Sequence, residues 1–244
     1  MDAEQLADKL VSWLREKVLA AHGKGVVLGM SGGIDSSVLA VVCQRAFPRS
    51  TLGVIMPCHS HPGDEEHARA IASKFSITTS TVVLDSVFDT LLHVLPNDQT
   101  DPAVTRLAEA NLKARLRMLT LYYFANQLNY VVAGAGNRSE LYLGYFTKHG
   151  DSGVDILPLG NLVKGEVREL AGFLGVPQAI IDKPPSAGLW PGQTDEKELG
   201  FSYAELDRYL TSGKAPAKLR QKIESMMAAT EHKRQPPPQP IFPA

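Results

Sequence analysis

The amino-acid sequence predicts an α/β protein in which helices cover both faces of a parallel sheet, all in a single domain. Three observations support this fold class. Short apolar, β-branched runs alternate with longer amphipathic segments through the first half of the chain. A glycine-rich turn joins one of these runs to a helix-compatible segment. The chain has 244 residues, 44% of them hydrophobic, which is enough to bury one large core.

Composition and charge argue against several classes of protein. The net charge is -1, so we expect no bulk electrostatic attraction to nucleic acid or to an anionic membrane. No signal peptide or long apolar segment is evident, and Cys43 and Cys58 alone provide no disulfide framework. We therefore expect a cytoplasmic protein that binds neither nucleic acid nor membrane.

The elements follow in a strand–helix order. Asp2 is expected to cap an amphipathic first helix that ends before Gly23. Strands are predicted over residues 25–28, 51–56, 79–84 and 130–134. Helices are predicted after residue 37, from Asp64 to about Phe75, from Asp85 or Ser86 to before Pro96, and over residues 102–127. This order predicts a doubly wound sheet with Rossmann-like handedness.

The long helix at 102–127 carries three stripes of side chains at about 100° per residue. The first stripe is expected to be core, the second to be an amphipathic boundary, a dinucleotide surface or an oligomer interface, and the third to be a solvated or partner-facing edge. Their members are, in order, Leu112, Leu116, Leu119 and Tyr123; Asn111, Arg115, Met118 and Tyr122; and Arg106, Glu109, Lys113 and Arg117.

Residues 29–37, with the sequence GMSGGIDSS, form the glycine-rich turn. Gly32 and Gly33 let the backbone approach an anion closely, and the serine hydroxyls add donors. Asp35 would repel a phosphate unless a divalent cation such as Mg²⁺ lies between them. No lysine stands where a Walker A loop requires one, so the pattern S-G-G-x-D-S instead resembles the pyrophosphate loop of the N-type ATP pyrophosphatases. An ordinary capped turn is the alternative.

Two further segments need separate interpretation. Cys58, His59 and His61 are too close in sequence for a typical structural zinc site, so we expect a mobile loop there. Residues 235–244 are rich in proline and are expected to form an extended or disordered tail after a domain spanning residues 1–234.

The second half of the chain resembles the ammonia-dependent NAD synthetases. The matching motifs are GNRSE at 136–140, GYFTKHGD at 144–151, DILPL at 155–159, LVK at 162–164, KPPSAGLW at 183–190 and GQTDE at 192–196. With the pyrophosphate loop and residues 111–117, the resemblance covers nearly the whole chain. It implies a fold like that of the adenine nucleotide α-hydrolases.

The resemblance also implies a reaction. The carboxylate of deamido-NAD would attack the α-phosphate of ATP, and ammonia would then displace AMP from the adenylate to give NAD. ATP would be the co-substrate and Mg²⁺ the cofactor, held by Asp35 and Glu140.

The residues implied to act fall into three groups. Asp151 and Lys164 are the catalytic candidates, Asp151 because ammonium must lose a proton before attack. The ATP-binding candidates are Gly29, Met30, Ser31, Gly32, Gly33, Ile34, Asp35, Ser36, Lys164 and Ser186. The candidates for binding deamido-NAD are Asn111, Arg115, Tyr145, Lys148, Asp155, His232 and Lys233.

Plain structural roles remain open for several of these side chains. They include a surface lysine at a helix start for Lys164, a helix-dipole carboxylate for Glu140, turn residues for Asp151 and Asp155, a cap for Ser186, and a solvated end for His232 and Lys233. The chain also departs from the family pattern: Ala135 stands where a threonine often contacts ATP, and Gly188 where an aspartate is common.

Other functions stay open at this point. Another adenylating amidotransferase, such as one similar to GMP synthetase, or a thiolase could use the same loop, and a nucleotide-binding module could use it without catalysis. No region of the chain corresponds to a glutaminase domain, so we expect free ammonia or ammonia from a separate glutaminase subunit. The resemblance further implies a homodimer with deamido-NAD near the subunit interface.

Overall fold

The protein was analysed as a computed structural model that describes residues 2–96, 101–188, 190 and 192–242. Its core is a four-stranded parallel sheet in the order β3-β2-β1-β4. The strands are β1 (Val26–Gly29), β2 (Thr51–Ile55), β3 (Thr78–Thr81) and β4 (Val131–Val132). The chain moves outward from β1 in one direction and then returns to place β4 on its other side. The gap between β1 and β4 is therefore the topological switch point, where such sheets bind ligands.

Helices cover both faces of this sheet, which confirms the predicted doubly wound α/β fold in a single domain. One apolar core joins α1 (Ala3–Ala20), α2 (Ile34–Ala46), α3 (Pro62–Lys74), α7 (Lys164–Leu174) and α8 (Gln178–Ile181) to the sheet. The other core lies beneath α4 (Asp85–Val94) and α5 (Pro102–Leu128). Val27, Val54 and Val132 point into the second core, whereas Val26, Leu28 and Ile55 point into the first, as the alternation of side chains along a strand requires.

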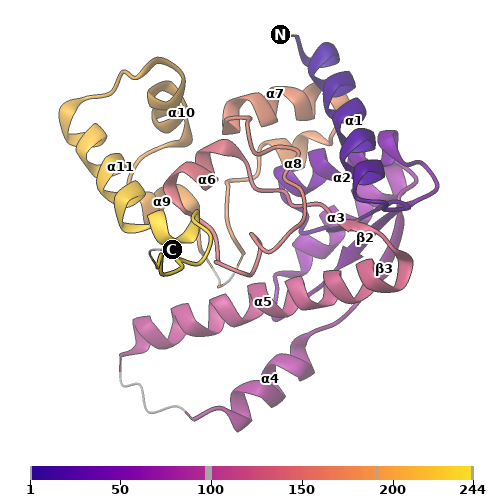
Figure 1. Ribbon diagram of the computed structural model, residues 1–244, viewed down its shortest axis with the longest axis horizontal. Helices are drawn as coiled ribbons and strands as arrows, with labels where there is room; N and C mark the ends of the chain where they lie inside the picture. Colours follow the sequence, from indigo (N-terminus) through magenta and orange to yellow (C-terminus); the bar gives the residue numbers. More distant parts are fainter. Residues whose placement is uncertain (1, 97–100, 189, 191, 243–244) are drawn as a thin grey trace.

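A third apolar cluster is built from the C-terminal helices and lies beside the sheet domain (Figure 1). It joins α6 (Arg138–Leu143), α9 (Asp195–Leu199), α10 (Tyr203–Ser212) and α11 (Ala217–Ala229), which is followed by a 3₁₀ turn at Glu231–Lys233. Its most buried aliphatic members, at 0–1% exposure, are Leu143, Leu199, Leu206 and Ile223. The cluster holds α6, which follows β4, against the end of the chain.

Local sequence signals set several helix ends as expected, but not all. Asp2 caps α1 by accepting a hydrogen bond from the Gln5 amide at 2.8 Å, as predicted. The predicted cap of α4 by Asp85 or Ser86 is wrong, because Leu84 holds the N-cap position and no side chain caps the helix. The Asp85 carboxylate accepts a hydrogen bond from the His59 amide at 2.7 Å instead, so it secures the loop after β2. The third strand is also shorter than predicted and ends at Thr81.

The first and third stripes of α5 differ from expectation. Leu116 is buried, but Leu119 and Tyr123 are 63% and 60% exposed, so the predicted core stripe is only partly core. Arg117 was assigned to a solvated or partner-facing edge, yet its guanidinium donates to the Met56 carbonyl and to the Ser60 hydroxyl, both at 3.1 Å. The face that α5 turns toward the rest of the protein therefore differs from the face predicted from its apolar residues. The reason is that residues 147–155 pack against its second stripe, as described below.

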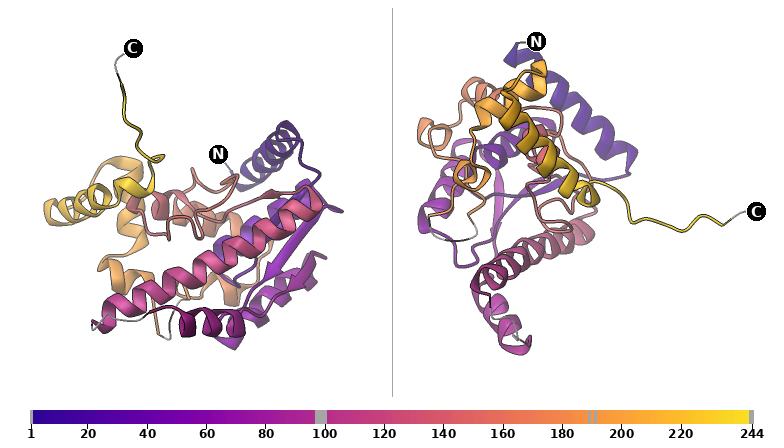
Figure 2. Two further views of the ribbon diagram at one scale, coloured as in Figure 1. Left: turned by 60° about the horizontal axis from the view of Figure 1, so that its bottom comes forward. Right: turned by 90° about the vertical axis from the view of Figure 1, so that its left-hand side faces the viewer.

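The end of the chain leaves the body of the protein. Residues 235–242 are exposed and form neither helix nor strand. Figure 2 shows this tail projecting away from the C-terminal helices. The division into a domain at residues 1–234 and a proline-rich tail remains a prediction. No helix among the described residues combines the length and apolar character that crossing a membrane requires.

Candidate active site

The glycine-rich turn begins where β1 ends, at Gly29, and leads into α2 with Gly33 at the N-cap. Gly32 has φ +74°, and a Cβ there would lie 2.1 Å from the Asp64 carbonyl oxygen, so the position requires glycine. The hydroxyls of Ser36 and Ser37 donate to the Gly33 carbonyl at 3.0 and 2.8 Å, which fixes the start of the helix. The predicted ATP-binding residues at 29–36 therefore form a close turn at the N-terminus of α2, the geometry that suits an anion.

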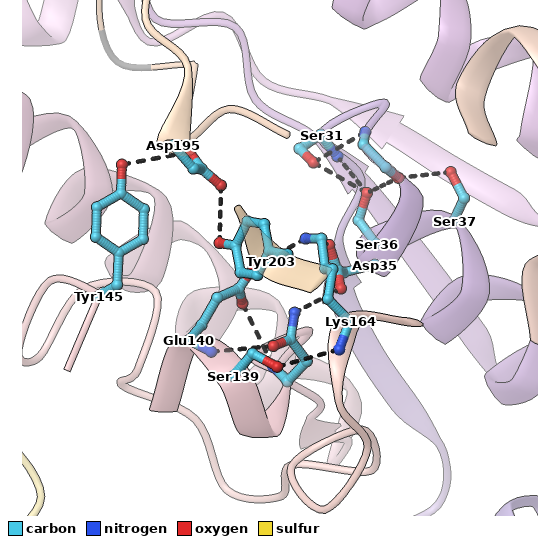
Figure 3. A network of polar contacts seen from close by, with 12 residues as sticks. Ser31, Asp35, Ser36, Ser37, Ser139, Glu140, Tyr145, Lys164, Asp195 and Tyr203 are labelled. Atoms are coloured by element: carbon cyan, nitrogen blue, oxygen red, sulfur yellow. Dashed lines mark hydrogen bonds and ion pairs between the residues drawn. The ribbon is translucent and has the colours of Figure 1, made fainter. Parts of the chain in front are cut away.

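Lys164 lies between two carboxylates that come from different helices (Figure 3). Its Nζ is 2.6 Å from Asp35 Oδ2 on α2 and 3.0 Å from Glu140 Oε1 on α6. The three side chains are 6%, 16% and 19% exposed, respectively. Three candidates from separate motifs thus meet at the switch point, and none of them is a surface residue.

The charges of this cluster are set by burial and by mutual attraction. Burial alone would lower the pKa of Lys164, but Asp35 and Glu140 outweigh it and raise the pKa above its usual range, so the ammonium stays protonated. Burial raises the pKa of Glu140 to about 7, against the opposing attraction of Lys164. Ionising Glu140 in addition to Asp35 is therefore costly in this site unless further positive charge is present.

Asp195 belongs to the same site; it lies in the GQTDE motif at 192–196 but was not among the predicted site residues. The residue begins α9 and is only 3% exposed. Its carboxylate accepts hydrogen bonds from the hydroxyls of Tyr203 at 3.0 Å and Tyr145 at 3.3 Å (Figure 3). Burial raises its pKa, although Lys164 favours the ionised form. Lys164 Nζ also lies 5.0 Å from the centre of the Tyr203 ring, which links Asp195 to the lysine.

The second stripe of α5 faces the segment at 147–155. Asn111 Oδ1 accepts from the Thr147 hydroxyl at 2.7 Å, and Arg115 Nη2 donates to the Lys148 carbonyl at 3.2 Å. About two helical turns further along, the Tyr122 hydroxyl donates to Asp155 Oδ1 at 2.9 Å. The stripe therefore contacts and supports a loop, although Arg115 stays exposed, and these contacts bring three of the predicted acceptor-binding residues, Asn111, Arg115 and Asp155, to one side of α5.

The remaining acceptor candidates have hydrogen-bonded partners of their own. Lys148 Nζ donates to the His232 carbonyl at 2.8 Å, and Lys233 Nζ donates to the carbonyls of Gly144 and Phe146 at 2.9 and 2.8 Å. The C-terminal turn is thus tied to the loop after α6. The Tyr145 hydroxyl donates to Glu198 at 2.7 Å as well as to Asp195, so this ring is held by its polar end.

Two other candidates lie on turns. Asp151 Oδ1 accepts from the Thr147 amide at 2.8 Å, which closes the turn that precedes Asp155. Ser186 Oγ accepts from the Gly188 amide at 3.1 Å, and the segment is held to the start of α3 by the ion pair between Lys183 and Asp64. Lys183 and Ser186 thus lie on the segment that approaches the glycine-rich turn through α3.

The described residues include no group of three or more His, Cys, Asp or Glu side chains arranged to hold a metal ion. His59 Nε2 lies 2.8 Å from Asp89 Oδ1. Asp35 and Glu140 alone could supply two hard oxygen ligands, and any further ligands would have to come from water or from a bound substrate.

Taken together, the turn can hold an anion, the lysine can neutralise transferring phosphates, and the carboxylate pair can hold a divalent cation beside them. This arrangement suits cleavage of a nucleoside triphosphate. The acceptor would then lie toward the loop at 147–155 and α5.

Comparison with known proteins agrees with this assignment. The family model described as NAD synthase matches residues 6–237. A curated NH₃-dependent NAD⁺ synthetase from Carboxydothermus hydrogenoformans is 51% identical over 239 residues, covering 98% of each chain.

Solved structures are similar over the same length. An NMN synthetase from Francisella tularensis superposes with a TM-score of 0.92 at 36% identity, covering 99% of this chain and 100% of the other. An NH₃-dependent NAD synthetase from Campylobacter jejuni, solved with a nitrate ion, gives a TM-score of 0.82 at 27% identity with the same coverage.

Proposed function

This chain belongs to the NAD synthase family, and from that membership we propose that it converts deamido-NAD to NAD with ammonia and ATP. The observation that carries the proposal is the convergence of Lys164, Asp35 and Glu140 beside the glycine-rich turn at the switch point of the sheet. The products are AMP and pyrophosphate. The GMP synthetase-like, thiolase and non-catalytic alternatives are not favoured, because the family match extends through both halves of the chain.

The first step activates a poor acyl group. A nicotinate carboxylate oxygen attacks the α-phosphorus of ATP, the bond to the bridging oxygen of the pyrophosphate breaks, and a mixed anhydride with AMP forms. The amides and hydroxyls of residues 29–36 receive the departing pyrophosphate at the N-terminus of α2. The Lys164 ammonium, buried and protonated, stabilises the negative charge that develops on the phosphates.

Asp35 and Glu140 are the residues that would hold Mg²⁺. They are two carboxylates on different helices that are already bridged by one cation, Lys164, so the pair fits a hard divalent ion. The metal would neutralise pyrophosphate as it departs. Two protein carboxylates would not be enough to complete the coordination of Mg²⁺, so water and phosphate oxygens would be its other ligands.

The second step forms the amide. Ammonia attacks the activated carbonyl carbon, a proton is lost, and AMP leaves with the electron pair of the anhydride bond. We assign the acceptor to the surface formed by Asn111, Arg115, Lys148 and Asp155, which is polar and supported by α5. Tyr145 adds an aromatic face at its edge, and His232 and Lys233 approach it through their ties to the loop after α6.

Asp151 is the proposed proton acceptor. It lies on the same loop as Lys148 and Asp155, and its carboxylate is held to the backbone of that loop. Ammonium must lose a proton before it can attack, and a carboxylate at the acceptor end is placed to receive it. Ser186 is proposed as a further hydroxyl donor to ATP, on a segment already tied to α3 by Lys183.

A second candidate substrate is favoured by one observation. The NMN synthetase from Francisella tularensis matches this chain with a higher TM-score and identity, 0.92 and 36%, than the Campylobacter jejuni NAD synthetase, 0.82 and 27%. Amidation of nicotinate mononucleotide needs the same two steps and lacks only the adenylyl half of the acceptor. The activating site would be unchanged, and the choice would depend on the acceptor surface.

A direct assay separates these functions. The protein is incubated with ATP, Mg²⁺ and ammonium together with deamido-NAD, nicotinate mononucleotide or xanthosine monophosphate, and AMP and amide product are quantified. We expect AMP and NAD in equal amounts with deamido-NAD. A larger kcat/KM with the mononucleotide would select the second candidate, and AMP formed only with xanthosine monophosphate would refute both.

The nitrogen source is tested in the same assay. Replacing ammonium with glutamine should give negligible NAD from the isolated chain, because we propose that ammonia is used free or is delivered by a separate glutaminase subunit. Robust turnover with glutamine alone would refute this part of the proposal.

We also propose that the protein is a homodimer that associates through α4 and α5. These helices form one outer side of the molecule (Figure 1) and expose large apolar side chains that include Val94, Leu107, Leu119 and Tyr123, at 56–68% exposure. Exposed apolar side chains gathered on neighbouring helices are typical of an interface. Light scattering should give the dimer mass, and the Leu119→Lys variant should shift it toward monomer; a monomeric wild-type protein would contradict the proposal.

A further inference from the structure

Asn137 is a buried residue that contacts both carboxylates of the proposed metal site, Asp35 through its side chain and Glu140 through its backbone amide. It is 0% exposed and stands at the N-cap of α6, directly after the turn that follows β4. Its Nδ2 donates to Asp35 Oδ1 at 2.8 Å, across a sequence separation of 102 residues. Its Oδ1 accepts from the Glu140 amide at 3.0 Å, and its own amide donates to Glu140 Oε2 at 3.3 Å.

These contacts complete a closed arrangement with Lys164. The lysine contacts Asp35 Oδ2 and Glu140 Oε1, and Asn137 contacts the other oxygen of each carboxylate. Two carboxylates so close repel each other, and each could rotate away from the other about its side-chain bonds. Lys164 supplies the opposing charge, whereas Asn137 fixes the direction of both carboxylates through the backbone of α6.

The side chains of Lys164 and Asn137 are expected to respond differently when substrate binds. Lys164 is a flexible ammonium that is proposed to contact phosphates, and a cation bound between the carboxylates would replace it there. Asn137 is short, buried and fixed in its rotamer by the cap, so it can keep Asp35 oriented after the lysine has moved. Any metal bound by the pair would therefore depend on Asn137 for its geometry, as ligands generally depend on the groups that orient them.

Helix capping alone does not explain an asparagine at this position. Serine or aspartate caps a helix about as well, because either oxygen can accept from the amide three residues on. The Asn137 amide accepts from the Glu140 N–H through Oδ1 and donates to Asp35 through Nδ2, whereas an ionised aspartate has no donor to offer. An aspartate would place a third negative charge in the cluster.

We propose that Asn137 is a positioning residue that sets the relative orientation of Asp35 and Glu140 for a divalent cation. The inference rests on the proposed function to the extent that this pair is the metal site. Asn137 does not contact the acceptor surface, so its loss should leave acceptor binding intact.

The test uses the Asn137→Ser variant, which keeps a capping oxygen and removes the amide donor. The Mg²⁺ concentration that gives half of the Mg²⁺-dependent increase in Tm at fixed ATP is measured, and then the same quantity for AMP formation. We expect both concentrations to rise by about 10–100-fold, as for loss of a group that orients a metal ligand. The KM for deamido-NAD should stay within about twofold of wild type, since the variant does not reach that surface.

Ser202→Ala is the matched control. Ser202 caps α10 in the same kind of capping box, and its hydroxyl bonds Glu205 rather than either carboxylate of the pair. It should lower Tm through loss of about 1 kcal/mol of cap stability and leave the Mg²⁺ dependence unchanged. If Asn137→Ser behaves like this control, Asn137 is only a cap and the proposal is wrong.

A double-mutant cycle on unfolding gives a second readout that needs no substrate. The losses of stability from Asn137→Ser and Asp35→Asn should be less than additive, because each removes the same contact. Additive losses would overturn the proposal. Asn137→Asp keeps a capping oxygen but adds a third negative charge, so it should lower the free energy of unfolding more than Asn137→Ser does. A wild-type protein that Mg²⁺ and ATP stabilise but that forms no NAD would refute the proposed function and leave these tests valid.

Discussion

Replacing Lys164 with methionine tests the centre of the site, because it removes the cation between Asp35 and Glu140 and keeps most of the side-chain volume. Removing one partner of a buried ion pair costs about 3–5 kcal/mol, since the other charge is left without compensation. The carboxylates are 16% and 19% exposed and keep their contacts with Asn137, so we expect the lower end, about 3 kcal/mol. At roughly 2–4 °C per kcal/mol for a chain of this size, Tm should fall by about 6–12 °C.

Thermal unfolding with and without Mg²⁺ measures this effect. In wild type every oxygen of the two carboxylates already has a protein donor, so Mg²⁺ without ATP should change Tm little. In Lys164→Met the same ion should restore part of the lost stability, because it replaces the missing charge. ATP cleavage should be lost in the variant at any Mg²⁺ concentration, since Lys164 is the residue assigned to stabilise charge on the phosphates.

Lys17→Met is the control for loss of a lysine. Lys17 pairs with Glu16 at 2.9 Å on the surface, with exposures of 42% and 68%, so this variant should lose only about 0–1 kcal/mol. If Lys164→Met unfolds at the wild-type Tm, the buried pair does not hold in solution. If Mg²⁺ alone stabilises both proteins equally, Lys164 does not occupy the position between the carboxylates.

Three further predictions follow from individual contacts. Gly32→Ala should destabilise the protein by at least about 1–3 kcal/mol and abolish the shift of Tm by ATP, because its Cβ would meet the Asp64 carbonyl; an unchanged shift would contradict the close turn. Arg115→Ala should raise the KM for deamido-NAD and leave the Tm shift by ATP intact, and loss of both would show that Arg115 supports the whole fold instead. Burial raises the pKa of Asp195, so the folded state binds its proton more tightly than the unfolded state, and its contribution to stability falls as pH rises from its ordinary 3.8 through the folded value. Asp195→Asn should therefore gain free energy of unfolding relative to wild type with rising pH in urea titrations, and a constant difference would refute the raised pKa.

The sheet and the glycine-rich turn were predictable because their signals are local. An apolar β-branched run forms β1, and the paired glycines and the serine-aspartate pattern follow it directly within residues 29–37. Asp2 likewise needs only the neighbouring amide to act as a cap. Such features depend on short-range sterics and hydrogen bonding, and the fold does not change them.

The orientation of α5 was only partly predictable because periodicity reveals the stripes of a helix but not what covers each stripe. Leu119 and Tyr123 look like core by their apolar character, yet they lie on the outer side. The segment at 147–155 has no periodic pattern, and it packs on the mixed stripe through Thr147 and Asp155. A long-range contact between a helix and an irregular segment leaves no signal in the residues of either partner taken alone.

The chemical grouping at the site required tertiary structure as well. Lys164 lies 129 residues from Asp35 in sequence, and only the family resemblance suggested that both contact ATP. Asp195 was missed because an acidic residue in the first turn of a helix is common for reasons of the helix dipole. Its burial follows from Tyr145 and Tyr203, two hydroxyls that converge on it from α10 and from the loop after α6.

The central claim is that the site activates a nicotinate carboxylate by transferring AMP to it. Deamido-NAD labelled with ¹⁸O in both carboxylate oxygens tests this claim, with ATP, Mg²⁺ and ammonium present and the products analysed by mass spectrometry. Each turnover should leave one ¹⁸O in the amide of NAD and transfer the other to the phosphate of AMP. Unlabelled AMP, or label in pyrophosphate or inorganic phosphate, would contradict it.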